Sequence, residues 1–462
     1  MRKPMPASSN SANIFLIKFM NDFTPWMLLV DVGIISLLLL VGKYLRAKVR
    51  FIQRFFIPPS LLAGLIALIL GPEVLGWLPL SSNTGTYAGI LIALVFSTLP
   101  LTSQSKPRGS SVGRLWAYFQ SGMLLQWALG GLLGYLIFNI LFHSNPAFGL
   151  SMPAGYCGGH GTAAAIGAAF SGYGIDEMLS LAMTSATVGI ICSIVIGMWI
   201  ISLGAMKGRT AFLKEYSELP EELRTGILPK DKRVSMGEAS FSAISLDSMS
   251  FNFAIVALIA LGGYGLCQFV QYFWPILKLP VFSCAFLVGI FIVWLLRRCK
   301  FDAYISKPIV GHLGGAFTDY LVAFGVASIK IEIVFEYVVP LIMLLLLGLA
   351  FTFLYVFSIG ARINKNYAFE KSIFTWGWFT GTMAMGIALL RIADPESKSR
   401  CLDECALAYL YITPVEIALV TFAPICFVNG YGGCFVAVCA VVGLAILFWA
   451  RQKGWLSKNQ AE

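Results

Sequence analysis

Long uninterrupted apolar runs constrain this chain more than any other feature. One of them, VVPLIMLLLLGLAFTFLYVFSIG (338–360), has no charged side chain, and similar runs recur along the 462 residues. Each is long enough to cross about 30 Å of hydrocarbon as a helix, whereas the strands of a β-barrel would alternate over about ten residues. The sequence therefore predicts an all-α polytopic membrane protein.

The apolar runs predict eleven spans, and two glycine-rich stretches, about 150–171 and about 372–390, are left over. The predicted spans are 24–42, 58–77, 87–104, 115–142, 177–203, 251–274, 279–296, 308–329, 334–358, 406–428 and 434–450.

The net charge of +10 is a signal of topology, because 28 of the 33 Lys and Arg fall in alternate loops. Short loops rich in Lys and Arg stay in the cytoplasm, so no nucleic-acid partner is needed to explain the charge. Every basic loop lies on one side only if both glycine-rich stretches enter the membrane and return on the same side. We therefore predict two re-entrant segments and a cytoplasmic C-terminus in the plasma (inner) membrane.

The two halves of the chain repeat each other at a near-constant offset. Ile57-Pro58 and Leu279-Pro280 each open a span, and CGGHGTAAAIG in the first half is echoed by WGWFTGTMAMG in the second. Each half has five spans and a re-entrant loop, and because five is odd the second half is inverted. Inverted repeats with broken helices are typical of secondary transporters. The predicted regions are a leader (1–23), a first repeat (24–203), a polar cytoplasmic linker (204–250), a second repeat (251–428) and an extra span with a tail (429–462).

The glycine motifs are the predicted substrate site. Glycine allows the backbone to turn and a ligand to approach it, and the amides at the helix start that follows favour a carboxylate. Small residues that only let helices pack closely are the alternative for a single motif. Two motifs at matching positions favour the site, and its predicted residues are Gly158, Gly159, His160, Gly161, Thr162, Thr380, Gly381 and Thr382.

Four ionisable residues inside the apolar segments have open roles. Asp319 and Glu416 are predicted to bind the coupling cation or to pair with Arg391, and Arg391 is predicted to clamp a substrate carboxylate or to act as a cytoplasmic anchor. His160 is a ligand, a proton carrier or a structural group. A Cys157–His160 nucleophile pair in a membrane-embedded enzyme is a further alternative. The ten cysteines follow neither a metal-binding spacing nor a disulfide framework, and no cofactor is expected.

The motif SMPAGYCGGHGTAAAIGAAFSGYGI (151–175) resembles the first re-entrant motif of the sodium/glutamate symporter family, in which GGHGT is distinctive. The resemblance extends over roughly residues 24–428, through IPPSLLAGL, KLPVFSCAFLVG and NYAFEKS. It implies two inverted five-helix halves, as in the similar citrate/malate sodium symporters, with Na⁺-coupled uptake and commonly a homodimer. Carried over, the first loop tip is GGHGT (158–162), and Gly377 and Gly381 belong to the second.

The chain departs from the family pattern in three ways. The second motif has bulky residues, among them Trp378 and Phe379, an additional span follows residue 428, and Asp319 and Glu416 are inserted charges. The sequence therefore predicts a divergent Na⁺-coupled symporter for glutamate or a related small carboxylate or amino acid. A proton-coupled or exchange carrier of an organic anion is the alternative.

Overall fold

The computed structural model places helices along most of the chain and no strand among the residues that it describes. The predicted leader (1–23) and much of the predicted linker (204–250) lie outside them. The described residues are 24–54, 57–102, 110–206, 210, 225, 227–230, 233, 235–238, 241, 244–274, 279–364, 366–394 and 398–456.

The helices follow the predicted apolar runs closely. They are α2 Pro25–Lys48, α3 Arg50–Arg54, α4 Pro59–Leu70, α5 Thr84–Thr102, α6 Ser110–Leu133, α7 Asn139–Phe142, α8 Ser151–Tyr156, α9 Gly159–Ser171, α10 Glu177–Met206, α12 Ser248–Phe273, α13 Val281–Arg298, α14 Lys307–Ala327, α15 Ile331–Glu336, α16 Val338–Ile363, α17 Ala368–Thr380, α18 Met383–Ala393, α19 Cys401–Val428 and α20 Gly432–Gln452.

Ten helices in the described part of the chain are long and apolar enough to cross a membrane. They correspond to ten of the eleven predicted spans. The exception is the predicted span 58–77, where α4 has only 12 residues and ends at Gly71. Pro72 follows at once, and a glycine with a proline just beyond it is a common way to stop a helix. The predicted length of this span is therefore wrong.

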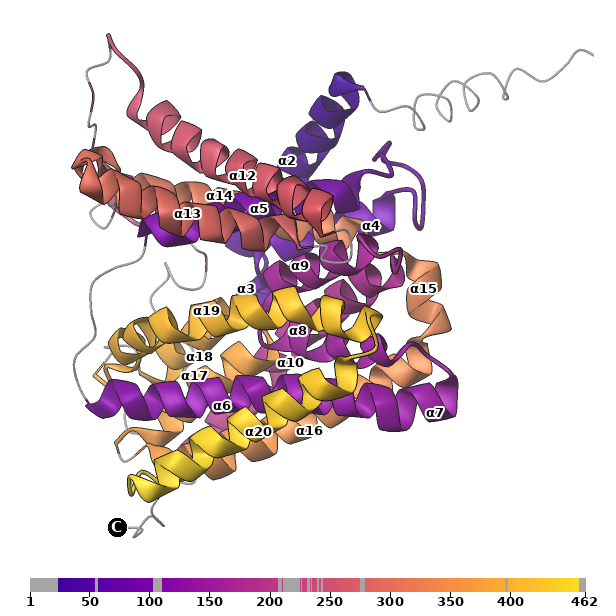
Figure 1. Cartoon of the computed structure of the whole chain (residues 1–462), viewed down its shortest axis with the longest axis vertical. Helices are drawn as coiled ribbons and strands as arrows, with labels where there is room; N and C mark the ends of the chain where they lie inside the picture. The colour runs from indigo at the N-terminus through magenta and orange to yellow at the C-terminus, as the bar shows by residue number, and fades with distance from the viewer. Residues whose placement is uncertain are drawn as a thin grey trace, which may run out of the picture.

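The helices pack as two bundles (Figure 1). The first bundle consists of α2, α4, α5, α12, α13 and α14, and the second consists of α6, α8, α10 and α16 to α20. Helix α9 lies between them, because it packs on α10 and α19 of the second bundle and on α5 and α14 of the first. Each bundle thus combines helices from both halves of the chain.

The order of elements in the first half recurs in the second. Three helices (α2, α4, α5) precede a long helix (α6), a broken helix (α8 and α9) and another long helix (α10). The same series runs from α12 through α16 and the broken α17–α18 to α19. The additional helix α20 packs along α6, where Trp116 and Trp449 are in ring contact.

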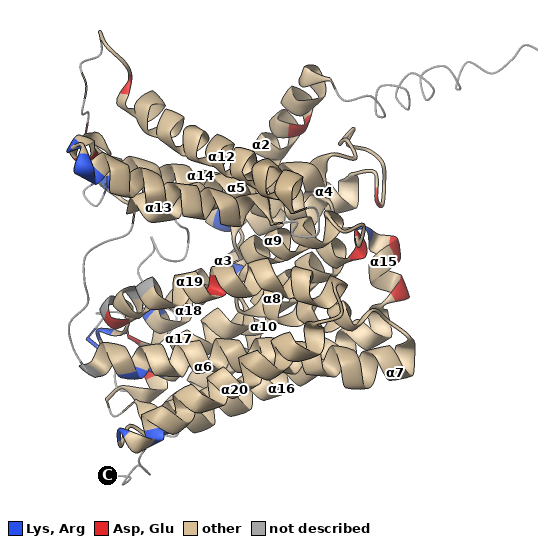
Figure 2. Ribbon diagram, in the orientation of Figure 1, with Lys and Arg blue, Asp and Glu red and all other residues tan. Residues whose placement is uncertain are grey.

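Lys and Arg gather mainly at one end of the helices, on the left in Figure 2, whereas Asp and Glu are prominent at the other. Each of the helices α2, α13, α16 and α20 has at least one basic residue in its last turn. Lys330, next to α15, is an exception to this distribution, because it lies close to the acidic residue Glu73. This one-sided distribution is the pattern from which the topology is predicted.

Candidate functional site

Both glycine motifs form interrupted helices. The first interruption is at Cys157 and Gly158, between α8 and α9. The second is at Gly381 and Thr382, between α17 and α18. Helix α18 folds back along α17, since a Cβ atom added to Gly377 would lie 2.6 Å from the Cα atom of Gly386.

The two interruptions touch each other. A Cβ atom on Gly159 would lie 2.4 Å from Cγ2 of Thr382 and 3.0 Å from the carbonyl oxygen of Gly381. Gly159 also has a φ of +62°, a conformation that glycine reaches without the cost borne by other residues. The sequence of the first motif therefore permits both the turn and the close approach to the second.

Helix α10 packs against both broken helices. Its Gly189 lies against the carbonyl oxygen of Thr380, to which an added Cβ atom would be 2.3 Å away. One turn further on, Ser193 Oγ donates to the Gly377 carbonyl oxygen at 3.1 Å, and the Ser193 carbonyl accepts from Trp376 Nε1 at 3.1 Å. These contacts fix α17 relative to α10, and thereby fix the position of the second interruption.

Two helix N-termini meet where the interruptions touch. Helix α9 begins at Gly159 and has no side-chain cap. Helix α18 begins after Thr382, whose Oγ1 accepts from the Met385 backbone N at 3.3 Å. Helix N-termini carry partial positive charge and unpaired N–H groups, which favour a negatively charged group beside them. The C-terminus of α17 ends at the same contact and brings the Gly381 carbonyl oxygen close to Gly159.

Glu416 places a carboxylate at the start of α9. Its Oε1 accepts from Thr162 Oγ1 at 3.4 Å and its Oε2 accepts from Tyr409 OH at 3.0 Å. The ring of Tyr409 packs against Trp378 of α17 with a centroid distance of 5.6 Å. Glu416 thus contacts the first broken helix directly, through Thr162, and the second indirectly, through the ring contact of Tyr409 with Trp378. Within the described residues, no three His, Cys, Asp or Glu side chains are grouped to hold a metal ion, so any cation here relies on fewer charged ligands.

His160 and Thr380 have protein partners. His160 is 2% exposed, and its Nε2 lies 3.1 Å from Thr187 Oγ1 of α10. Thr380 Oγ1 donates to the carbonyl oxygen of Trp376 in its own helix at 2.6 Å. The His160 contact thus joins α9 to α10, whereas the Thr380 bond stays within α17. Gly161 and Gly158 are half-buried.

Asp319 and Arg391 lie away from the contact between the interruptions. Asp319, on α14, is beside Ser60 of α4 and Lys43 of α2, within the first bundle. Arg391 is in the last turn of α18, about 13 Å along the helix from Thr382 at 1.5 Å per residue. Asp31 accepts from the backbone N and Oγ of Ser81 at 2.9 and 2.5 Å, which anchors the segment before α5.

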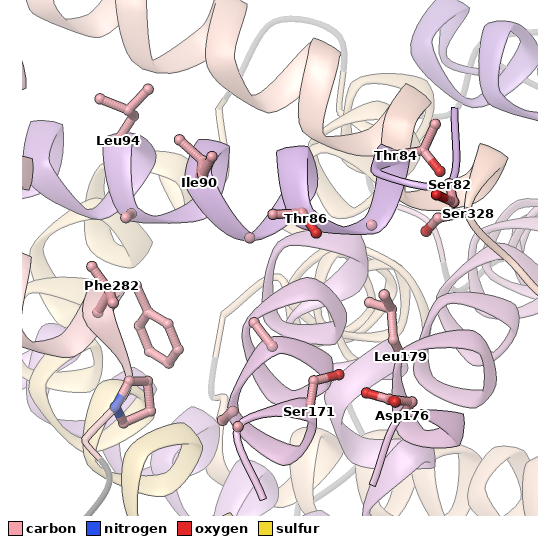
Figure 3. Close-up of a pocket in the computed structure, with 18 of the residues that line it drawn as sticks. Ser82, Thr84, Thr86, Ile90, Leu94, Ser171, Asp176, Leu179, Phe282 and Ser328 are labelled. Carbon is pink, nitrogen blue, oxygen red and sulfur yellow. The ribbon is translucent and has the colours of Figure 1, made fainter. Parts of the chain in front are cut away.

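A cavity of about 1080 Å³ opens between the two bundles, and α5, α9, α10, α12 and α13 contribute to its wall. Figure 3 shows Thr86 of α5 pointing into it from one side, with Ser171, Asp176 and Leu179 opposite and Phe282 at its edge. Along the same seam, the position of Gly161 faces Ile92 of α5. The second arm of the first broken helix therefore leads from the interruption to the cavity.

Charged groups lie at the cavity wall near the connecting loops. Glu73, Asp176 and Lys330 line it together with several hydroxyl groups. Partial burial raises the pKa of the Glu73 carboxyl above its usual range, and the nearby Lys330 partly offsets that rise. The cavity is thus polar at this end and apolar along α12 and α13, where Leu261 and Phe282 are among its walls.

Three features of the site lie beyond the sequence-based predictions. They are the cavity, Tyr409 as the partner of Glu416, and Gln126 of α6, whose Nε2 donates to the Phe379 carbonyl oxygen at 3.0 Å. Tyr409 precedes Glu416 by two helical turns, a spacing that places both on one face of a helix. This pair alone could therefore have been predicted from the spacing in the sequence. The others depend on contacts between distant segments.

The comparisons with a family model and with individual proteins agree on one family. The family model described as "Sodium/glutamate symporter" matches residues 28–383. The sodium/glutamate symporter of Escherichia coli (strain K12) is 25% identical over 349 residues, which cover 72% of this chain and 80% of that protein. The sodium/glutamate symporter of Shigella flexneri is similar to the same extent. The matched region includes both interruptions and ends before Arg391 and Glu416.

Proposed function

Because the chain belongs to the sodium/glutamate symporter family, we propose that it carries glutamate, or a related small carboxylate or amino acid, together with Na⁺. The family consists of transporters, with Na⁺ as the coupling ion and no cofactor, so the alternative of a membrane-embedded Cys157–His160 enzyme is dropped.

The substrate carboxylate binds beside the contact between the N-termini of α9 and α18. The observation that carries this proposal is the contact of Gly159 with Gly381 and Thr382. It brings two positive helix ends together, and an anion beside their contact is stabilised by the N–H groups of both. Gly158 precedes α9 and Gly161 and Thr162 lie in its first turn, where the hydroxyl of Thr162 is a second polar group. Arg391 remains a predicted carboxylate clamp, although it is at the other end of α18.

Na⁺ binds beside the substrate at Glu416. The carboxylate of Glu416 and the hydroxyl groups of Thr162 and Tyr409 supply oxygen ligands within one small region. Pro414 lies inside α19, two residues before Glu416, and a proline removes one helical hydrogen bond and frees a carbonyl oxygen. Na⁺ offsets the repulsion between Glu416 and an incoming carboxylate, which couples the two ligands. Asp319, next to Lys43 in the first bundle, is the alternative cation ligand, to be tested against Glu416.

Transport proceeds by alternating access between the two bundles. We assign α8–α9 and α17–α18 to re-entrant loops of two inverted repeats, in keeping with the repeated order of elements. Helix α9 lies between the bundles and borders the large cavity. The cavity then serves as the access route on one side, and movement of one bundle against the other closes it.

The basic end of the helices faces the cytoplasm, by the rule that Lys and Arg accumulate there. This orientation puts the C-terminus in the cytoplasm and the cavity on the outer side of the plasma (inner) membrane. A homodimer is the proposed assembly, following the family.

Uptake by purified full-length protein in liposomes tests the function. Labelled glutamate should accumulate when an inward Na⁺ gradient is imposed and not when K⁺ replaces Na⁺. Accumulation driven by a pH gradient without Na⁺ would instead favour the proton-coupled carrier. Entry of labelled substrate that is matched by equal release of internal substrate, without any ion gradient, would favour exchange.

A further inference from the structure

A second, smaller cavity lies at the basic end of the second bundle, apart from the interruptions. It has a volume of about 300 Å³. Three segments surround it: the start of α6, the connection between α16 and α17, and the connection between α18 and α19. We call it the basic-end pocket.

Positive charge exceeds negative charge in the lining of this pocket. Among the residues that the structure describes, its basic side chains are those of Arg114, Lys371, Lys398 and Arg400, and its carboxylate is that of Glu404. Glu404 Oε2 accepts from Lys371 Nζ at 2.7 Å, so this carboxylate neutralises the buried lysine. Arg114 and Arg400 add two further guanidinium groups to the lining, while the carboxylates of Glu370 and Asp394 lie near Lys371 and Glu404 around Cys401. The nearby Asp394 carboxylate accepts from the backbone N of Lys398 and of Ser399 and does not line the pocket.

The pocket also contains a buried donor that has no acceptor in the described part of the chain. Asn364 is 4% exposed, and its side-chain Nδ2 has no hydrogen-bond partner among the described residues. A buried amide nitrogen in this state is costly. A ligand with several acceptor oxygens would satisfy it together with the guanidinium groups, which only donate.

Tryptophans lie beside the pocket, at the basic end of the helices. Arg114 lies between two positions on α6 that contact tryptophans: the position of Gly113 faces Trp455 at 3.3 Å, and Trp116 is in ring contact with Trp449. Tryptophans gather at membrane–water interfaces. Basic pockets between helices at that level are suited to acidic headgroups.

We propose that the basic-end pocket binds a phosphate group, that of an anionic phospholipid headgroup or of a soluble phosphate. Arg114 and Arg400 bind its oxygens from opposite segments, and Asn364 donates from the buried side. A phosphate held in this way bridges α6 to both connections that flank the broken helix α17–α18. The site is independent of Na⁺ and of the transported carboxylate.

Binding to the purified full-length protein in a neutral detergent tests the proposal, without Na⁺ gradient or substrate. Retention of phosphatidylglycerol and of phosphatidylcholine is compared by native mass spectrometry, and thermal unfolding is measured with inorganic phosphate. Preferential retention of phosphatidylglycerol alone identifies the lipid as the source, and stabilisation by inorganic phosphate identifies the soluble form. Absence of both effects overturns the proposal.

Variants locate the binding. The double variant Arg114→Gln/Arg400→Gln should weaken binding about tenfold or more, since it removes two charge-assisted donors. Asn364→Asp keeps the size of the side chain and should also weaken binding, because it adds a negative charge. The control is Arg297→Gln, an exposed basic residue in the last turn of α13 in the other bundle, which should bind as the unaltered protein does. Binding by either pocket variant equal to that of the control would contradict the proposed place, and unfolding without ligand checks that each variant is folded.

Discussion

Gly159 of the first interrupted helix lies against Thr382 of the second, so closely that a methyl group on Gly159 would be 2.4 Å from Thr382 Cγ2. The two residues come from motifs in opposite halves of the chain. Their contact brings the N-termini of α9 and α18 together. The proposed carboxylate site depends on this contact, and the predictions below test it and its surroundings.

Gly159→Ala should abolish most uptake. The added methyl group overlaps Thr382 and the Gly381 carbonyl oxygen, and an alanine at a φ of +62° costs about 1–2 kcal/mol in addition. We expect a lower midpoint of thermal unfolding and a loss of Na⁺-dependent uptake in liposomes.

Gly33→Ala, in α2 of the first bundle, is the matched control. A Cβ atom on Gly33 would meet no atom within 4 Å, and alanine is preferred to glycine inside a helix. Stability and uptake should therefore stay close to those of the unaltered protein. Uptake retained by Gly159→Ala at the level of Gly33→Ala would contradict the proposed role of the close contact.

Glu416→Gln should weaken Na⁺ activation. The amide oxygen of glutamine still accepts a hydrogen bond from Tyr409 or Thr162, so the fold should persist, but the negative charge is lost. Since losing an ionised ligand costs about 1.4 kcal/mol or more, the Na⁺ concentration for half-maximal uptake should rise about tenfold or more. Uptake is measured across a series of Na⁺ concentrations.

Asp319→Asn separates the two predicted cation ligands. Asp319 is next to Lys43 in the first bundle and not at the interruptions. The Na⁺ dependence of this variant should match that of the unaltered protein. A change in Asp319→Asn with none in Glu416→Gln would move the proposed Na⁺ site to α14.

Thr86→Trp should slow transport by filling the cavity between the bundles. Thr86 is exposed and points into the cavity in Figure 3, so the larger ring is accommodated without displacing the core. Leu132→Trp, at a lipid-exposed position of α6, is the control for a new tryptophan. Initial rates of uptake are compared at equal amounts of inserted protein. Equal rates in both variants would argue against the cavity as the access route.

The sequence predicted the helical class and ten spans because an apolar run long enough to cross the bilayer is a local signal. It failed at the span 58–77, where Gly71 and Pro72 end α4 early. The interruptions at Cys157 and Gly381 lie within the predicted glycine motifs, since glycine spacing is also local.

The contacts that make up the site were harder to predict. Thr162 and Glu416 are brought together by the packing of α9 on α19, and the cavity arises where α5 crosses α9 and α10. Such contacts depend on the relative placement of distant helices, which periodicity and composition do not encode. For the same reason, Asp319 and Glu416 looked equivalent in the sequence and have different neighbours in the structure.

Thermal unfolding of the purified full-length protein with Na⁺ and glutamate, separately and together, tests the central claim most directly. If the carboxylate and Na⁺ bind next to each other at the joined helix N-termini, each should strengthen the other, and the shift with both should exceed the sum of the separate shifts. A ligand at about 100 times its Kd stabilises by about 2.7 kcal/mol, which is readily measured. Stabilisation by glutamate that is unchanged when K⁺ replaces Na⁺ would contradict the coupled site.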